Sequence, residues 1–287
     1  MSKGYVILAQ NNKTDDYVKM AYVSAMSIKL TQKEIRDVTL ITDVPEAVPQ
    51  HYCKAFDTIL PIQWFDDAYN SEWKIENRWK LYHLTPYDET IILDADMLFF
   101  SDVSNWWKYL GKNFDLMITD KVYTYRNELI VNSYYRKAFI ENSLPNTYSA
   151  LTYFKKCDQA KEFWKLVEII IKNWEVFYQR LIKESRPKHL SIDVVFSLAV
   201  KMLGIEDKVF SSLDYPSFIH MKSRDQKWHY STDNWTDIAG VYLTDDCELK
   251  IGNYQQTGIF HYTEKNFLTD DILYKYEKKF MEDLNVR

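Results

Sequence analysis

The sequence predicts an α/β fold with a mixed, mostly parallel central sheet flanked by helices. An apolar run at residues 5–9, a helical pattern and a second apolar run at residues 37–42 follow one another in the order of a βαβ unit. Residues 90–93 form another apolar run without polar alternation, which is typical of a strand buried on both faces. No repeat or linker interrupts the 287 residues, so we expect one domain.

The first part of the chain alternates predicted strands and helices. Thr14 or Asp15 is expected to cap the first helix, because both residue types accept hydrogen bonds from the first helical turn. A second helix should end before Pro86, since the residue preceding proline disfavours helical geometry. Ser104 is expected to cap a third. The predicted strands here are residues 5–9, 37–42, 56–60, 90–93 and 114–119, and the second helix covers 71–84.

The second part contains two irregular polar segments, residues 120–146 and 222–256, which we interpret as functional loops. Between and after them, residues 148–154 and 257–261 are predicted strands. The predicted helices are residues 159–181, 190–203 and 268–284. The second irregular segment mixes basic and aromatic side chains that could contact nucleic acid, line a sugar cleft or form plain surface: Lys222, Arg224, Lys227, Trp228, His229, Tyr230 and Trp235.

Composition favours some classes of protein over others. Apolar residues make up 46% and charged residues 27% of the chain, which is typical of a folded domain. The net charge of −5 disfavours a dedicated duplex-binding protein, although a local basic face stays open. Three scattered cysteines indicate free thiols in a reducing compartment. The apolar run at residues 5–9 is too short for a signal peptide or a membrane span, so we expect a soluble cytoplasmic protein.

Two carboxylates, Asp94 and Asp96, follow the apolar run at residues 90–93. Ligands bind at the carboxyl ends of strands in open α/β sheets. Uncompensated buried carboxylates are costly, and an acid pair at this position suits a hard divalent cation that also binds phosphate. The alternative is a solvated turn with two acids. The first strand is followed by no G-x-G-x-x-G or Walker loop, which disfavours a dinucleotide site or a P-loop.

Five features in a fixed order resemble the GT-A glycosyltransferases, closest to the family 8, glycogenin-like group and its short bacterial and bacteriophage relatives. The resemblance extends from about residue 4 to residue 265. Its features are the first strand and polar loop with Tyr17, the basic pair Arg78 and Lys80, residues 85–96 ending in Asp94-Ala95-Asp96, an acid at Asp193, and residues 258–265 with His261 and Lys265.

The resemblance implies a single GT-A domain over residues 1–287. Residues 1–110 would form the nucleotide-sugar-binding half, residues 111–265 the acceptor-binding half and residues 266–287 a C-terminal helix. The implied ligands of Mn2+ or Mg2+ are Asp94, Asp96 and His261. The implied donor-binding residues are Ala9, Gln10, Asn11, Tyr17, Arg78, Lys80, Asp94, Ala95 and Lys265. The implied catalytic residues are Asp193, Asp96 and Lys265.

The expected function is metal-dependent transfer of a hexosyl or pentosyl group from a UDP-sugar to an acceptor hydroxyl, with retention of anomeric configuration. A divalent cation would stabilise the charge that develops on the leaving diphosphate. For the acceptor we rank a glycan first, a protein second and a modified phage DNA base third. No membrane span is expected, and the sequence leaves the oligomeric state open.

Structural roles compete with these assignments. Tyr17 could be a core tyrosine, His261 a structural histidine and Asp193 an acid placed by the helix dipole. A non-catalytic carbohydrate-binding protein would account for the aromatic content of 16%. A haloacid-dehalogenase-type phosphatase also uses Asp-x-Asp, but normally on its first strand. A sugar-nucleotide pyrophosphorylase needs a glycine-rich loop that this sequence lacks.

Overall fold

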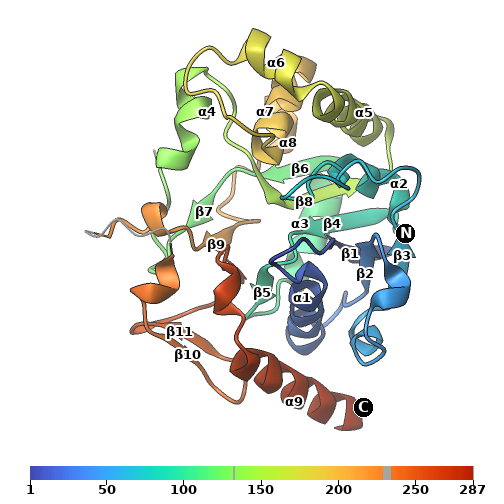
Figure 1. Cartoon of the computed structure of the whole chain (residues 1–287), viewed down its shortest axis with the longest axis vertical. Coiled ribbons are helices and arrows are strands. Elements are labelled where there is room, and N and C mark those ends of the chain that lie inside the picture. Colours follow the sequence, from blue (N-terminus) through green and yellow to red (C-terminus); the bar gives the residue numbers. More distant parts are fainter. Residues whose placement is uncertain (132, 229–233, 287) are drawn as a thin grey trace.

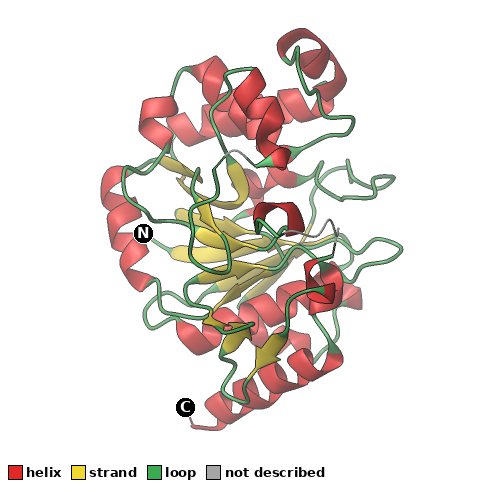
Figure 2. Ribbon diagram, turned by 90° about the vertical axis from the view of Figure 1, so that its left-hand side faces the viewer, coloured by secondary structure: helices red, strands yellow, loops and turns green. Residues whose placement is uncertain are grey.

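The computed structural model describes residues 1–131, 133–228 and 234–286. In that part of the chain a central sheet lies between two layers of helices (Figures 1 and 2). The sheet has the strand order β3-β2-β1-β4-β8-β6. Its strands are β1 (Lys3–Leu8), β2 (Val38–Thr42), β3 (Thr58–Pro61), β4 (Glu89–Leu93), β6 (Leu116–Thr119) and β8 (Tyr148–Lys155).

The central sheet is mixed, and most of its pairs are parallel. β1 pairs in parallel with both β2 and β4, and β2 pairs in parallel with β3. β8 lies antiparallel between β4 and β6. The α/β fold class with a mostly parallel sheet is therefore confirmed.

Alternating residues of the central strands fill two apolar cores, one on each face of the sheet. Tyr5 and Ile7 of β1 pack with apolar residues of α1 (Tyr17–Thr31) and α9 (Asp270–Val286). Val6 points to the opposite face and packs with α5 (Asp158–Lys172) and α7 (Ile192–Leu203). Because both faces are covered, the strands read as nearly continuous apolar runs. The remaining helices are α2 (Leu81–Leu84), α3 (Ser104–Asn113), α4 (Lys137–Glu141), α6 (Trp174–Leu181) and α8 (Glu206–Val209).

A second sheet, of four short strands, continues from the central one and has the order β5-β13-β9-β7. The last strand in sequence, β13, lies inside this sheet, antiparallel to β5 and parallel to β9. A third, antiparallel sheet of β10, β11 and β12 lies within residues 222–256. The strands are β5 (Met97–Phe99), β7 (Val122–Tyr123), β9 (Phe218–His220), β10 (Val241–Leu243), β11 (Leu249–Ile251), β12 (Tyr254–Gln255) and β13 (Ile259–His261).

The predicted helix at residues 71–84 is wrong in its first half. Residues 71–77 form no helix, and only η3 (Arg78–Lys80) and α2 are helical. Lys74 has a φ of +56°, which no right-handed helix allows. The Asn77 side chain accepts a hydrogen bond from the Asp67 backbone N–H at 3.1 Å and donates one to Gln10 Oε1 at 2.6 Å. These bonds to distant segments compete with the helical backbone pattern.

Two other helices differ from prediction. The expected helix at residues 159–181 is divided into α5 and α6 at Asn173, whose side-chain amide donates to the Ile169 carbonyl at 2.9 Å. That carbonyl would otherwise accept the backbone bond that continues the helix. Neither Thr14 nor Asp15 caps α1: Asp16 does so, accepting from the Lys19 N–H at 2.9 Å. In the described residues no helix is both long and apolar enough to span a membrane.

Candidate metal centre and the adjoining cavity

The turn Asp94-Ala95-Asp96 connects the two larger sheets. It leaves β4 of the central sheet, where the Asp94 N–H donates to the Ala150 carbonyl at 3.0 Å. It then enters β5, and Met97 pairs with His261 of β13. The Tyr262 N–H donates to the Asp96 carbonyl at 3.2 Å. Pairing of β5 with β13 therefore brings a histidine 165 residues away next to the acid pair.

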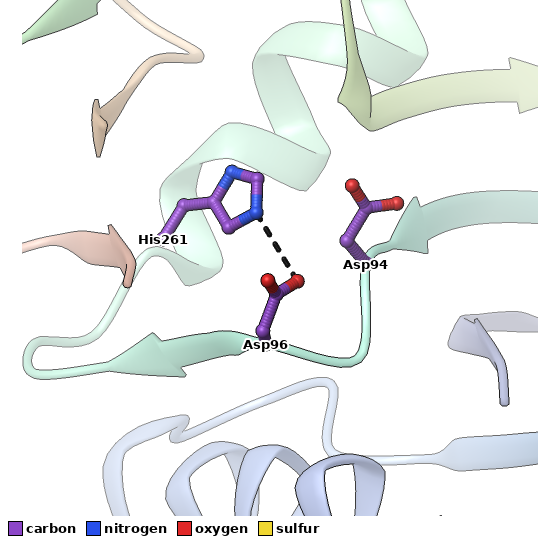
Figure 3. Close-up of side chains that lie close together, drawn as sticks. All are labelled: Asp94, Asp96 and His261. Atoms are coloured by element: carbon purple, nitrogen blue, oxygen red, sulfur yellow. Dashed lines mark hydrogen bonds and ion pairs between the residues drawn. The ribbon is translucent and has the colours of Figure 1, made fainter. Parts of the chain in front are cut away.

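Asp94, Asp96 and His261 form one cluster (Figure 3). One ligand atom from each residue lies within 4.8 Å of the others. His261 Nε2 is 3.1 Å from Asp96 Oδ1, and both side chains are buried, whereas Asp94 is partly exposed. His261 Nδ1 has no hydrogen-bond partner among the described residues. The cluster is closed toward the core and open at Asp94.

The buried Asp96 carboxylate is compensated by two basic groups. Burial alone would raise its pKa, but the Lys265 ammonium and the His261 imidazole hold it well below its usual range. Lys265 donates to Asp96 Oδ2. Burial works against the charged form of Lys265, yet Asp96 outweighs it and raises the pKa of this lysine. The Lys265 ammonium also lies 5.2 Å from the centroid of the Tyr17 ring.

The donor set suits a divalent cation. Two carboxylates and an imidazole are ligands that Mn2+ accepts, and Mg2+ would use mainly the carboxylates. Asp96 is 5% exposed and ionised, and its charge is balanced in this structure by Lys265. A cation held between Asp94 and Asp96 would take over that balancing role and leave Lys265 to face another anion. The residues present therefore fit a metal.

Arg78 and Lys80 point to different partners. Arg78 Nη1 is 2.6 Å from Asp94 Oδ1, and Nη2 donates to the Ser149 carbonyl at 2.7 Å. The Lys80 ammonium is 3.3 Å from Asp67 Oδ2 and also donates to the Phe65 carbonyl. Arg78 thus contacts the acid cluster, whereas Lys80 binds to the loop at residues 65–67 and holds it in position.

The polar loop after β1 is held by its own side chains. Ala9 is buried at the end of the strand. Gln10 is buried and donates to Asp66 Oδ2 at 3.2 Å. Asn11 Oδ1 accepts from the Val18 N–H at 3.0 Å, in the first turn of α1. Ala95 is buried between the two acids. The amide groups of Gln10 and Asn11 shape this loop and hold it beside α1.

Asp193 lies in the first turn of α7 and is bound by three groups. Its Oδ1 accepts from the Ser149 N–H at 2.8 Å and the Ser149 hydroxyl at 2.7 Å, and its Oδ2 is 3.0 Å from Arg136. Burial would raise the pKa of Asp193, but Arg136 and Ser149 lower it below the usual range. Ser149 also accepts from Arg78 through its carbonyl, so Arg78 and Ser149 together connect Asp94 to Asp193.

A cavity of about 430 Å³ adjoins Asp193. Two of its residues, Arg136 and His220, were not predicted as site residues from the sequence, whereas Lys222 is among the side chains expected to contact nucleic acid, line a sugar cleft or form plain surface. His220 pairs in register with His261, and the two ring centroids are 5.1 Å apart. A signal was present, since Phe218-Ile219-His220 and Ile259-Phe260-His261 share a pattern of two apolar residues before histidine. His229 and Tyr230, which belong to the predicted irregular segment at residues 222–256, lie outside the described residues.

Comparison with solved structures assigns the fold. The galactosyltransferase LgtC, solved in complex with donor and acceptor sugar analogs, matches 97% of this chain and 94% of its own at 13% identity, with a TM-score of 0.50. Mouse xyloside xylosyltransferase 1 in its apo form matches 74% and 85% at 12% identity, with a TM-score of 0.46.

The glycosyltransferase GlyE of Streptococcus pneumoniae matches 74% of this chain at 12% identity, with a TM-score of 0.42, and the match spans 45% of GlyE. No protein-family model and no curated protein sequence matches the chain. The two lower scores add nothing to the assignment. The match to LgtC, nearly complete in both chains, shows that this chain has the GT-A fold of glycosyltransferases.

Proposed function

We propose that this chain is a metal-dependent glycosyltransferase of the family 8 type that moves a sugar from a UDP-sugar to an acceptor hydroxyl. The observation that carries the proposal is the cluster of Asp94, Asp96 and His261, assembled from the turn between β4 and β5 and from the end of β13. The GT-A fold places this cluster at the carboxyl end of a central strand, where α/β sheets bind ligands.

Asp94, Asp96 and His261 would hold Mn2+ or Mg2+. When bound, the cation supplies Lewis-acid stabilisation of the charge that develops on the leaving diphosphate. Lys265, which donates to Asp96 here, would bind the diphosphate once a cation neutralised that carboxylate. Tyr17, whose ring lies 5.2 Å from the Lys265 ammonium, would stack on the uracil of the same donor.

The loop formed by Ala9, Gln10 and Asn11 would border the uracil. Ala95 would lie against the phosphates. Arg78 would hold Asp94 in position and add positive charge near the donor. Lys80 would act only indirectly, by fixing the loop at residues 65–67. In this assignment residues 1–110, together with His261 and Lys265, bind the donor, whereas the rest of residues 111–265 binds the acceptor.

Asp193 is an ionised carboxylate held at a fixed position by Ser149 and Arg136. We assign it to the transferred sugar or the acceptor, where it would accept hydrogen bonds from hydroxyl groups. We expect retention of anomeric configuration, with the departing phosphate oxygen taking the acceptor's proton. The acceptor is expected to be a glycan, ahead of a protein or a modified DNA base.

Calorimetry with UDP tests the proposal. We expect binding that requires Mn2+, exceeds GDP binding and is abolished in Asp96→Asn. The control is Asp115→Asn, because Asp115 also pairs with a lysine, at 3.1 Å, but lies away from the cluster. Equal UDP affinity with and without Mn2+ would refute the metal assignment. Proton NMR of the product anomer then tests retention.

A further inference from the structure

The cavity beside Asp193 has an unusual charge for this protein. The chain as a whole carries a net charge of −5. Among the described residues, however, the charged side chains that line the cavity are one carboxylate and four cations, namely Asp193, Arg136, Lys137, Arg186 and Lys222. A cavity with this lining concentrates positive potential, which favours an anionic ligand.

The basic groups are only partly neutralised within the protein. Arg136 pairs with Asp193 at 3.0 Å. The guanidinium of Arg186 donates to the carbonyls of Ile182 at 3.0 Å and Gln179 at 3.3 Å, which carry no net charge. Arg186 therefore keeps its positive charge at the wall of the cavity, and a guanidinium binds carboxylate or phosphate with good geometry.

Lys222 is a partly buried cation of the cavity lining. Its ammonium lies 4.3 Å from the centroid of the Tyr135 ring. Burial lowers the pKa of Lys222, and the nearby carboxylates of Asp193 and Asp225 do not fully offset this effect. Asp225 does not line the cavity and accepts a hydrogen bond from Ser133. An anion in the cavity would supply the missing compensation for Lys222.

His220 links the cavity to the candidate metal centre. It is 7% exposed and lines the cavity, yet its Nδ1 has no hydrogen-bond partner among the described residues. That nitrogen is itself buried, and the other ring nitrogen, Nε2, lies 3.9 Å from Asp225 Oδ2, so His220 forms part of the cavity wall. The His220 ring lies 5.1 Å from that of His261, so the cavity borders the candidate metal centre.

We propose that this cavity binds an acidic sugar, one bearing a carboxylate or a phosphate, whose anionic group is held by Lys222 and Arg186. The inference rests on the proposed function, because the sugar is either the transferred group of the donor or the acceptor. Asp193, also in the cavity wall, would bind hydroxyl groups of the same sugar. The basic side chains would thus select for the charge and Asp193 for the hydroxyl pattern.

Calorimetry on the full chain tests this. The protein is first saturated with UDP and Mn2+, so that added phosphate groups cannot occupy the donor site. It is then titrated with glucose 6-phosphate, glucuronate and glucose. A separate arm compares UDP-glucuronate with UDP-glucose in the presence of Mn2+. The variants are Lys222→Met and Arg186→Gln, and the control is Lys188→Met, an exposed lysine outside the cavity lining.

We expect at least one acidic sugar to bind more tightly than its neutral counterpart, in the acceptor arm or in the donor arm. Lys222→Met should weaken that binding by about tenfold, because a charged hydrogen bond is lost, while Lys188→Met leaves it unchanged. Arg186→Gln, at an exposed residue, gives the same test if Lys222→Met does not fold.

Two results would overturn the inference in different ways. If UDP and Mn2+ bind but acidic and neutral sugars bind equally in both arms, or neither variant matters, the charge assignment fails and the proposed function stands. If UDP does not bind under any condition, the proposed function fails and this inference fails with it.

Discussion

Arg78 connects the two halves of the candidate site, and its removal gives a quantitative test of that connection. Its guanidinium contacts the Asp94 carboxylate at 2.6 Å and the Ser149 carbonyl at 2.7 Å. Ser149 in turn holds Asp193 through its backbone N–H and its hydroxyl. Arg78→Met keeps most of the apolar stem and removes both polar contacts.

The expected loss in the free energy of unfolding depends on the water contact or hydrogen bonds that Asp94 and Ser149 keep without Arg78. The Asp94 side chain is 31% exposed, so water replaces much of the lost ion pair, which leaves about 1 kcal/mol. The Ser149 carbonyl keeps a 3.2 Å hydrogen bond from the Thr152 hydroxyl, so losing the hydrogen bond from Arg78 also costs about 1 kcal/mol. An unfolding entropy of about 2.1 cal/mol/K per residue over 287 residues gives roughly 0.6 kcal/mol/K. A loss of about 2 kcal/mol therefore lowers the melting temperature by about 3 °C.

Differential scanning calorimetry measures this shift. Arg78→Lys should cost about half as much as Arg78→Met, because an ammonium keeps the charge beside Asp94 but not the planar two-partner geometry. The control is Glu72→Gln, an exposed residue of the preceding loop. A melting temperature of Arg78→Met within about 1 °C of wild type would refute the reasoning.

Two further predictions concern packing and pH. In Gly4→Ala the new Cβ would lie 2.3 Å from the buried Tyr87 ring, so we expect urea unfolding to show a loss of about 1–3 kcal/mol in the free energy of unfolding. The control is Gly240→Ala, because the space around Gly240 is open. Equal urea midpoints for the two variants would contradict the packing argument. Because the folded-state pKa of Asp193 is depressed, its contribution to stability is present above about pH 4 and is lost as pH falls through the folded-state value. Asp193→Asn should thus be less stable than wild type at pH 7 and converge with it in acid, and parallel stability curves would exclude this.

Local patterns in the sequence predicted most of the central sheet, because buried strands differ clearly from their surroundings. They did not predict where β4 ends and β5 begins a new sheet, since both strands are apolar and only the turn between them is polar. They also overestimated the helix at residues 71–84, because Asn77 bonds to Gln10, 67 residues away in sequence. Hydrogen bonds between distant segments have no periodicity to detect.

The candidate site likewise contains some residues that local sequence patterns predicted and others that they did not. Asp94 and Asp96 were identified from their position after a strand, because both positions belong to one short segment. His261 entered only through the resemblance to GT-A enzymes, since strand pairing brings it to the acids. Lys222 was noted only as one of several basic residues of an irregular segment. The role of Arg136 depends on its pairing with Asp193, 57 residues away in sequence, and its neighbours in sequence do not indicate that role.

The position of β13 has a consequence for how the protein is made. β13 is the last of the described strands, yet it lies between β5 and β9 rather than at an edge. During synthesis, when Asp94 and Asp96 have emerged from the ribosome, the nascent chain still lacks the strand that carries His261. The three-residue cluster can therefore form only after nearly the whole chain has been synthesised, so a prematurely terminated product would have Asp94 and Asp96 without the histidine.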